Sequence, residues 1–151
     1  MLLTGMSAAS CLPADNYHSF CSVPSTGWSK NDTLYLQLQE QREESQCQAY
    51  IEIRHTQEYP YQSVWLLVSH NEADSLTFRT DTIECRLTDN TGKFDGNGLS
   101  GSYQKSIPFK AIRLQKNTHP LFKITHFMKE KEIQGITDIG IRLSYGQNLS
   151  E

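Results

Sequence analysis

The sequence of 151 residues has no long hydrophobic run, no excess of basic residues and no cysteine pair of the CxxC type. No apolar stretch approaches the roughly 20 residues of a transmembrane helix, so any membrane attachment would have to be covalent. Fourteen Lys and Arg against 17 Asp and Glu give a net charge of -3, which argues against nucleic acid as a partner. Helical periodicity is nearly absent, and only residues 128–133 could form a helical turn or two.

Recognisable catalytic and metal-binding motifs are missing as well. The sequence contains no G-x-S-x-G, H-E-x-x-H or P-loop motif. The stretch DNTGKFDGNG invites a calcium interpretation, but Thr91 and Lys93 stand where ligands are needed, so we expect a glycine-turned connection. We therefore expect no metal, no cofactor and no enzymatic activity. The five histidines are scattered without metal-ligand spacing: His18, His55, His70, His119 and His126.

The four cysteines, at positions 11, 21, 47 and 85, are too far apart in the sequence for a zinc site. Cys47 and Cys85 each lie on the apolar side of an alternating stretch. They are expected to be either two buried thiols or a disulfide between neighbouring strands, and the sequence leaves both alternatives open.

From Trp28 onward, apolar and polar residues alternate with the period of a β-strand. In DTLYLQLQ the leucines share one face, and CQAYIEIRH repeats the pattern, so each of these strands has one buried and one solvated face. SVWLLVSH is apolar on both faces and is expected to be a central strand. Residues 76–88 change parity, which predicts a bulge, bend or turn near residues 79–82. Further strands are expected at 103–109, 110–115, 119–128 and 136–145.

This pattern predicts an all-β protein: an antiparallel β-sandwich of seven or eight strands, with either jelly-roll or immunoglobulin-like topology. The β-sandwich domain is expected to cover residues 27–147. Residues 1–26, rich in Ser, Ala, Pro and Gly, are expected to be a truncated signal-like segment followed by a flexible tether over roughly 12–26.

Three aromatic residues in YPYQSVW form the one candidate ligand site in the body of the chain. Tyr59, Tyr61 and Trp65 would point the same way in an extended segment. Aromatic rings with polar edges stack well on sugars, so the group is a candidate contact for a glycan or a protein partner. The alternative is that these rings pack over the outer face of the sheet.

The N-terminal stretch LLTGMSAAS, followed by Cys11, has the small residues and cysteine of a lipoprotein signal. Further along, the blocks YHSF, GWSKNDTLYLQL, IEIRHTQEYPYQSVWLLV and MKEKEIQGITDIGIRL follow in an order that resembles the gliding-motility lipoprotein H family (GldH) of the Bacteroidetes. The most specific pieces are Arg54 with Tyr59-Pro60-Tyr61, the glycines at 92, 96 and 98, and Gly135-Ile136 with Asp138-Ile139-Gly140.

The resemblance implies a non-catalytic cell-envelope lipoprotein that is acylated at Cys11 and faces the periplasm or lies at the outer membrane. We expect a membrane-tethered protein-interaction domain whose partners are other envelope or motility-apparatus proteins. The alternative is a glycan-binding module built on Tyr59, Tyr61 and Trp65. An enzyme would require a buried carboxylate pair or a triad in a cleft.

Overall fold

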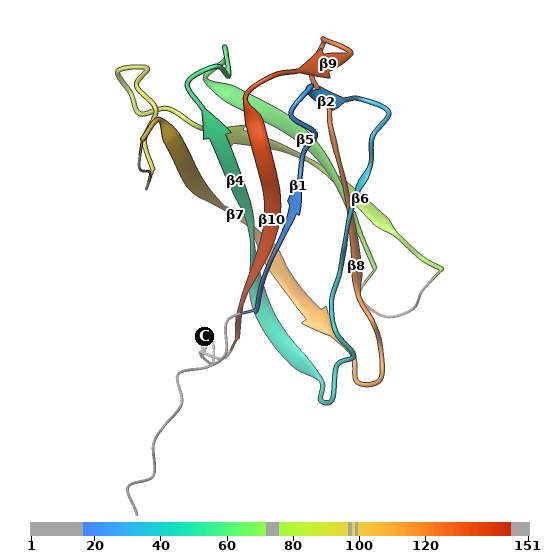
Figure 1. The fold of residues 1–151 in the computed structure, drawn as a ribbon. Helices are drawn as coiled ribbons and strands as arrows, with labels where there is room; N and C mark the ends of the chain where they lie inside the picture. Colours follow the sequence, from blue (N-terminus) through green and yellow to red (C-terminus); the bar gives the residue numbers. More distant parts are fainter. Residues whose placement is uncertain (1–16, 72–75, 97, 99, 146–151) are drawn as a thin grey trace, which may run out of the picture.

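A computed structural model describes residues 17–71, 76–96, 98 and 100–145, and these form ten strands and no helix. Nothing in this part of the chain could span a membrane as a helix. The predicted all-β antiparallel sandwich is confirmed (Figure 1). One sheet contains β1 (Tyr17–Ser22), β10 (Ile136–Tyr145), β4 (Ser45–Thr56) and β7 (Ser102–Leu114), in that order. The other contains β3 (Leu34–Gln37), β8 (Leu121–His126), β5 (Ser63–His70) and β6 (Arg79–Arg86), and β2 (Trp28–Ser29) pairs with β9 (Glu132–Ile133).

The strand pairing decides between the two topologies that the sequence left open. The first strand pairs with the last, the second with the second-to-last, and so on inward to β5 and β6, always antiparallel. The chain is therefore one long hairpin. Its folding adds the side-by-side pairs β10–β4 and β5–β8, which build the two four-stranded sheets. This arrangement is a jelly roll.

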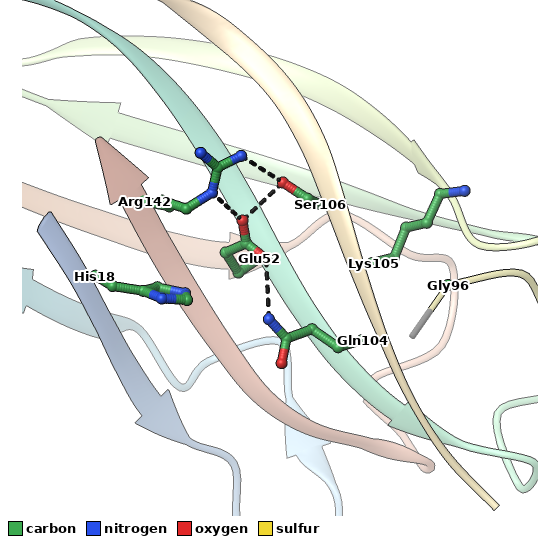
Figure 2. Close-up of a pocket in the computed structure, with 7 residues that line it drawn as sticks. All are labelled: His18, Glu52, Gly96, Gln104, Lys105, Ser106 and Arg142. Atoms are coloured by element: carbon green, nitrogen blue, oxygen red, sulfur yellow. Dashed lines mark hydrogen bonds and ion pairs between the residues drawn. The ribbon is translucent and has the colours of Figure 1, made fainter. Parts of the chain in front are cut away.

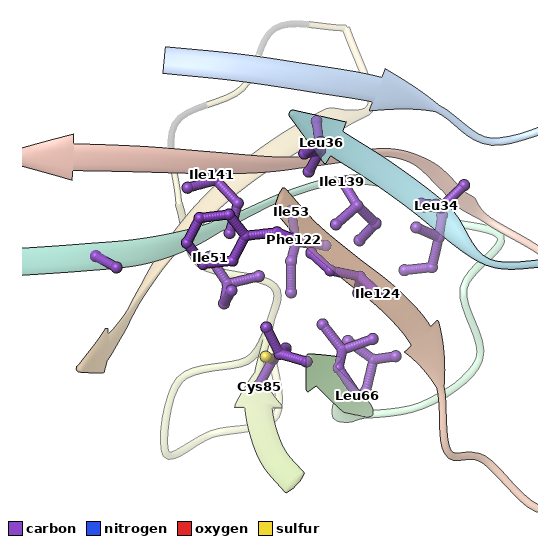
Figure 3. Packing of buried hydrophobic residues seen from close by; sticks show 14 of the residues in the cluster. Leu34, Leu36, Ile51, Ile53, Leu66, Cys85, Phe122, Ile124, Ile139 and Ile141 are labelled. Carbon is purple, nitrogen blue, oxygen red and sulfur yellow. The ribbon is translucent and has the colours of Figure 1, made fainter. Parts of the chain in front are cut away.

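The core lies between the two sheets and is made by the alternating residues that the sequence pattern predicted (Figure 3). β4 contributes Ile51 and Ile53, and β10 contributes Ile139 and Ile141, all fully buried. The opposite sheet supplies residues such as Leu66 and Phe122 from β5 and β8. β5 lies between β8 and β6, as expected of a central strand.

The predicted strands 103–109 and 110–115 are in fact the single strand β7. Tyr50 of β4 pairs with Pro108, while Ala49 pairs with Lys110, so Phe109 is an extra residue in the ladder. Such a bulge reverses which residues face the core: Ile107 pairs opposite Ile51 before it, and Ile112 opposite Cys47 after it. The boundary expected between residues 109 and 110 is therefore a bulge inside one strand.

Two other local predictions are wrong. No bulge occurs at 79–82, because β6 begins at Arg79 and its pairing with β5 is continuous to Arg86. Leu76 and Phe78 precede the strand, and Leu76 is 89% exposed, so the change of parity reflects the start of β6. Residues 128–133 form no helical turn, because Glu132 and Ile133 pair with β2.

The boundary expected at residue 27 also needs correction. Residues 17–22 were assigned to the tether, but they form β1, an edge strand paired along its whole length with β10. Tyr17, Ser19 and Cys21 pair opposite the buried residues of β10, so β1 is part of the sandwich. The interval between Cys11 and the folded domain is therefore much shorter than the sequence pattern suggested.

The cysteines of the described residues are thiols, which settles the alternative for Cys47 and Cys85. Cys47 lies on β4 and Cys85 on β6, in different sheets, and both are buried. The Cys47 thiol donates to the carbonyl of Ile112 at 3.9 Å. Burial raises the pKa of the Cys85 thiol to about 12, so it behaves as a small hydrophobic side chain.

Three histidines of the described part of the chain are buried, His55, His70 and His126, and burial shifts the pKa of the first and the last. His126 is 1% exposed, with Nε2–H donating to Trp28 O at 3.1 Å and Nδ1 accepting from Met128 N. His55 is fully buried, stacked on Tyr103 and in edge contact with Phe94. Burial lowers the pKa of both imidazoles below the ordinary value of 6.5.

We expect the free energy of unfolding to fall as the pH drops from about 7 to 5. Below pH 6.5 the unfolded chain binds protons at His55 and His126, whereas the folded protein does not, because its histidine pKa values are lowered. The stability that is present above pH 6.5 is therefore lost progressively between 6.5 and the lowered pKa of the folded state. Each histidine contributes a slope of at most about 1.4 kcal/mol per pH unit. Urea unfolding at several pH values measures this slope. His55→Phe should reduce it, His119→Gln at an exposed position should not, and equal slopes in all three proteins would contradict the assignment.

Candidate functional site

The outer face of the β1-β10-β4-β7 sheet carries a cluster of polar side chains around one carboxylate. On β4, residues of even number point away from the core, and Glu52 stands among them between the buried Ile51 and Ile53. Cross-strand pairing places Ser106 of β7 and Gly140 of β10 on either side of Glu52. Three neighbouring strands thus bring residues 52, 106 and 140 together although they are far apart in the sequence.

Glu52 is almost completely covered although it lies on an outward face, with an exposed fraction of 2%. Its Oε1 accepts from Ser106 Oγ at 2.7 Å and from Arg142 Nε at 2.9 Å. Its Oε2 accepts from Gln104 Nε2 at 3.2 Å. A buried carboxylate is tolerated only when it is paired and hydrogen-bonded, and both requirements are met here.

Two arginines of this face lie over aromatic rings. The guanidinium of Arg142 lies 3.9 Å from the ring centroid of Tyr50, and that of Arg54 lies 3.8 Å from the ring centroid of Phe20. Such stacking is favourable and fixes the plane of the guanidinium group. Arg54 Nε also donates to Gln104 Oε1 at 3.1 Å, which links the second arginine to the Glu52 cluster.

Gly140 makes room for this arrangement. A Cβ atom at this position would lie 2.7 Å from the Phe20 ring and from the Ser19 carbonyl oxygen. Without a side chain here, the ring of Phe20 lies across β10 and reaches Arg54 on β4. The space that the Phe20 ring needs therefore explains the glycine in the Asp138-Ile139-Gly140 segment.

A pocket of about 410 Å³ opens beside the cluster (Figure 2). Gly96, from the segment between β6 and β7, lies at its edge. Its walls come from β1, β4, β7 and β10, with His18, Glu52, Gln104, Lys105, Ser106 and Arg142 as the lining side chains. The Lys105 amine is paired with Asp95. The pocket is therefore polar, with cationic and neutral donors around a carboxylate that is already neutralised.

The chemistry of this cluster is better suited to binding than to acid–base catalysis. Ser106 Oγ donates directly to Glu52 and accepts from Arg142 Nη2 at 3.1 Å, so no histidine bridges the hydroxyl and the carboxylate. A serine nucleophile needs a base that takes its proton and is itself oriented by a third group. Within the described residues, no group of three or more His, Cys, Asp or Glu side chains could hold a metal ion.

The structure divides the three aromatic residues that the sequence singled out between core and surface, although the rings of Tyr59 and Tyr61 stay in edge contact with 5.7 Å between their centroids. The 57–62 connection is not extended, and Tyr59 is 1% exposed, with its hydroxyl donating to Ser63 O at 2.7 Å. The common orientation expected for the three is therefore wrong for Tyr59. Tyr61 and Trp65 are at the surface, 37% and 42% exposed. Cys11, the predicted lipidation site, lies outside the described residues.

Tyr61 and Trp65 belong to a larger surface group that we call the aromatic patch, made of the exposed Tyr61, Trp65 and Phe127 and the partly buried Met128. Phe127 is 58% exposed, and its N–H donates to Trp65 O at 2.7 Å. Met128 Sδ lies 3.3 Å from the backbone nitrogen of Trp65. The Tyr61 hydroxyl donates to Glu130, and this bond raises the pKa of the phenol. The sequence pointed to two of these residues and missed Phe127, because only the pairing of β8 with β5 brings it beside Trp65.

Sequence reasoning missed the Glu52 cluster altogether. Alternation correctly placed Glu52 and Arg54 on the outward face, but an outward carboxylate is normally solvated. The pairing of Glu52 with Arg142 joins strands 90 residues apart, and no local pattern reveals it.

The chain is similar to some solved structures and to one protein family. It is similar to an exo-beta-1,3-galactanase from Phanerochaete chrysosporium, with a TM-score of 0.45 and 10% identity, over 87% of this chain and 27% of the galactanase. It is also similar to the Eiger TNF from S. frugiperda, with a TM-score of 0.40 and 8% identity, over 93% of this chain and 99% of the other. No curated protein is detectably similar to it in sequence. The family model of the GldH lipoprotein matches residues 15–143, and the chain therefore belongs to the GldH lipoprotein family.

Proposed function

We propose that this protein is a lipid-anchored interaction domain that presents the aromatic patch to another envelope protein. Membership in the GldH lipoprotein family implies a membrane-anchored protein of the cell envelope, and this family is not known as one of enzymes. The anchor we propose is an acyl group on Cys11. The partner we expect is an envelope or motility-apparatus protein.

The short interval before β1 supports a definite orientation. Tyr17, the first residue of β1, is six residues after Cys11. Even when fully extended, six residues reach at most about 20 Å. Tyr17 pairs with Leu143, at the end of the sheet where β10 finishes and β4 begins. An acyl-cysteine at position 11 would hold this end of the sandwich close to the lipid.

The observation that carries the proposal is that the aromatic patch lies at the other end of the sandwich. Tyr61 and Trp65 follow the end of β4, and Phe127 follows the end of β8, while β4 begins near the start of β1 (Figure 1). A strand of 12 residues such as β4 is about 35 Å long, so the patch would stand well above the lipid. Exposed aromatic side chains on a rigid framework are typical of protein interfaces.

Photo-crosslinking in the native envelope tests both parts of the proposal. Trp65 is replaced by p-benzoylphenylalanine in the full-length protein expressed with a complete signal peptide. We expect a discrete crosslinked protein from position 65 and none from the same substitution at Arg113. Arg113 is exposed and pairs with Gln46 at the start of β4, so it lies at the end of the sandwich away from the aromatic patch. Adding Cys11→Ser should move the protein out of the membrane fraction and remove the crosslink.

The two parts can fail separately. If the Cys11→Ser protein stays in the membrane fraction, the proposed anchor is wrong. If position 65 yields no crosslinked protein, or position 113 yields the same one, the aromatic patch is not the interface.

A glycan-binding module is the second candidate. It is favoured by two exposed rings, Tyr61 and Trp65, and by the carboxylate of Glu130 that Tyr61 bonds, because sugars bind between aromatic faces and polar groups. Fluorescence titration with envelope polysaccharides distinguishes the two functions. Trp28 is fully buried, so a saturable change would report on Trp65, and it would favour the glycan-binding function.

A further inference from the structure

β6 is an edge strand whose free side has no strand beside it in the same sheet. It is last in the order β3-β8-β5-β6, and in the described part of the chain it pairs only with β5. Its register is continuous over all eight residues, from Arg79 to Arg86, without a proline or a bulge. An uninterrupted edge of this kind is a template for a further strand.

The other three edges of the two four-stranded sheets are interrupted or short. β7 contains Pro108, which lacks an N–H, next to the extra residue Phe109. β3 has four residues and β1 has six, and these two edges border each other, with the Tyr17 hydroxyl donating to Gln37 O at 3.4 Å. β6 therefore offers the longest uninterrupted edge of the two sheets.

The backbone groups on the free side of β6 belong to its even-numbered residues. Leu87 continues the register of β6, and its N–H donates to Gln62 O at 2.8 Å, so the odd-numbered residues bond to the β5 side. Because backbone groups alternate sides along a strand, the N–H and C=O of Thr80, Thr82 and Glu84 point away from β5. No hydrogen bond joins these groups to another described residue, and all three residues are exposed. They are therefore available to a new strand.

The side chains beside this edge favour apolar residues on the inner side of an added strand. Ile83 of β6 and Ile107 and Phe109 of β7 pack on the core but are only partly buried. Asp81 of β6 accepts from Lys110 of β7 at 3.0 Å, so the edges of the two sheets lie next to each other at this point. The inward side chains of an added strand would cover the apolar residues that this side of the sandwich leaves partly exposed.

The proposed anchor at Cys11 argues against a second copy of this chain as the added strand. Two β6 strands that pair antiparallel are related by a twofold axis perpendicular to the sheet. β6 ends at Arg86, opposite Ser63 and near the aromatic patch, so it runs away from the anchored end of the sandwich. The twofold axis would therefore invert the second sandwich and point its Cys11 away from the membrane. A segment of another protein has no such constraint.

We propose that β6 binds an extended segment of the envelope partner as a fifth strand of its sheet, with apolar residues inward and polar residues outward. This inference rests on the proposed function and specifies the form in which the partner binds. Trp65 is directly opposite Glu84 in the β5–β6 ladder, so outward side chains of the added strand would lie two strand spacings, about 10 Å, from Trp65. The free edge and the aromatic patch are thus parts of one surface. In recognition of this type, backbone hydrogen bonds supply the affinity and alternate side chains the specificity.

Photo-crosslinking from β6 in the native envelope tests the proposal. The full-length protein, expressed with a complete signal peptide, carries p-benzoylphenylalanine in place of Thr80. Thr82→Pro removes an outward N–H that the sandwich does not use, and an edge strand tolerates proline at such a position. Thr82→Val keeps this N–H and removes only the hydroxyl. We expect the same crosslinked partner with Thr82 and with Thr82→Val, and about 10-fold less of it with Thr82→Pro.

The outcomes separate this proposal from the proposed function. Equal yields with Thr82→Pro and Thr82→Val, no crosslink from position 80, or a crosslinked dimer of this chain would overturn the added strand. A crosslink from position 65 that persists with Thr82→Pro would leave the aromatic patch as the interface and remove β6 from it. A crosslink from position 80 that only Thr82→Pro abolishes, with none from position 65, would leave the edge and remove the patch.

Hydrogen exchange of the unmodified sequence keeps the test valid if Thr82→Pro does not fold. Exchange is compared between the full-length protein in native envelope vesicles and the same protein purified in detergent. The outward amides of Thr80, Thr82 and Glu84 should exchange about 10-fold more slowly in the vesicles, because a partner strand accepts their hydrogen bonds there. The amides of β3, at the other edge of the sheet, should exchange equally in both samples. Equal exchange of the β6 amides in both samples would contradict the added strand.

Discussion

Replacing Gly135 with alanine is expected to destabilise the protein by about 4 kcal/mol, because the new side chain has no room. Gly135 has a φ of 91°, and a Cβ atom there would lie 2.3 Å from Tyr59 N and 2.6 Å from Tyr59 Cα. The atoms it meets are backbone, which cannot turn aside as a flexible side chain can. The 57–62 connection would have to move away from β10, and the buried Tyr59 ring would lose its place in the core.

A second glycine separates backbone strain from steric overlap. Gly101 also has a positive φ, of 77°, but no described heavy atom lies within 4 Å of a Cβ built there. Gly101→Ala should therefore cost only about 1 kcal/mol. Urea unfolding of both variants measures the difference. Equal losses of stability would show that Tyr59 does not in fact pack against Gly135.

Replacing Arg142 with methionine should lower the free energy of unfolding by about 3 kcal/mol, because it leaves Glu52 buried without its cation. Ser106 and Gln104 would still donate to the carboxylate, but neither supplies a charge. Methionine retains much of the apolar volume that packs on Tyr50, so the loss reports mainly on the missing guanidinium. Glu52→Gln should cost less, because Arg142 is 26% exposed and can be solvated when its partner is neutral.

The same substitution at a surface ion pair provides the control. Arg113 is paired with Glu44, and their side chains are 62% and 51% exposed. Pairs of this kind contribute little, so Arg113→Met should change stability by less than about 0.5 kcal/mol. Denaturant unfolding of the three variants at one pH gives the comparison. If Arg142→Met and Arg113→Met had the same effect, the Glu52 cluster would not stabilise the fold.

Local alternation was a sound guide to the sandwich because it reports a property of each strand by itself. In β4, β5 and β10 every second residue is apolar, and these residues form the core. The same rule failed at Phe109, where an extra residue shifts the parity inside β7. It also failed for β1. This edge strand has only partly buried residues, and its segment was therefore predicted to be part of the tether.

The functional surfaces were less accessible to sequence reasoning. Tyr61 and Trp65 were found because aromatic residues stand out in a polar chain, while Phe127 lies beside Trp65 only because β8 pairs with β5. Tyr59 was assigned to the same group, but the close approach of Gly135 folds it inward. Cys11 stays a prediction that rests on the sequence.

The sequence by itself determined that the chain is an antiparallel β-sandwich of the GldH family. Strand periodicity and family motifs are local features, so they can be recognised without knowing which strands are neighbours. Only the tertiary structure decided the jelly-roll topology, the bulge in β7 and the Glu52 cluster. Each of these depends on which strands become neighbours, and that choice is made by long-range pairing. A residue such as Arg142 acquires its role from a carboxylate 90 positions away, which no local pattern encodes.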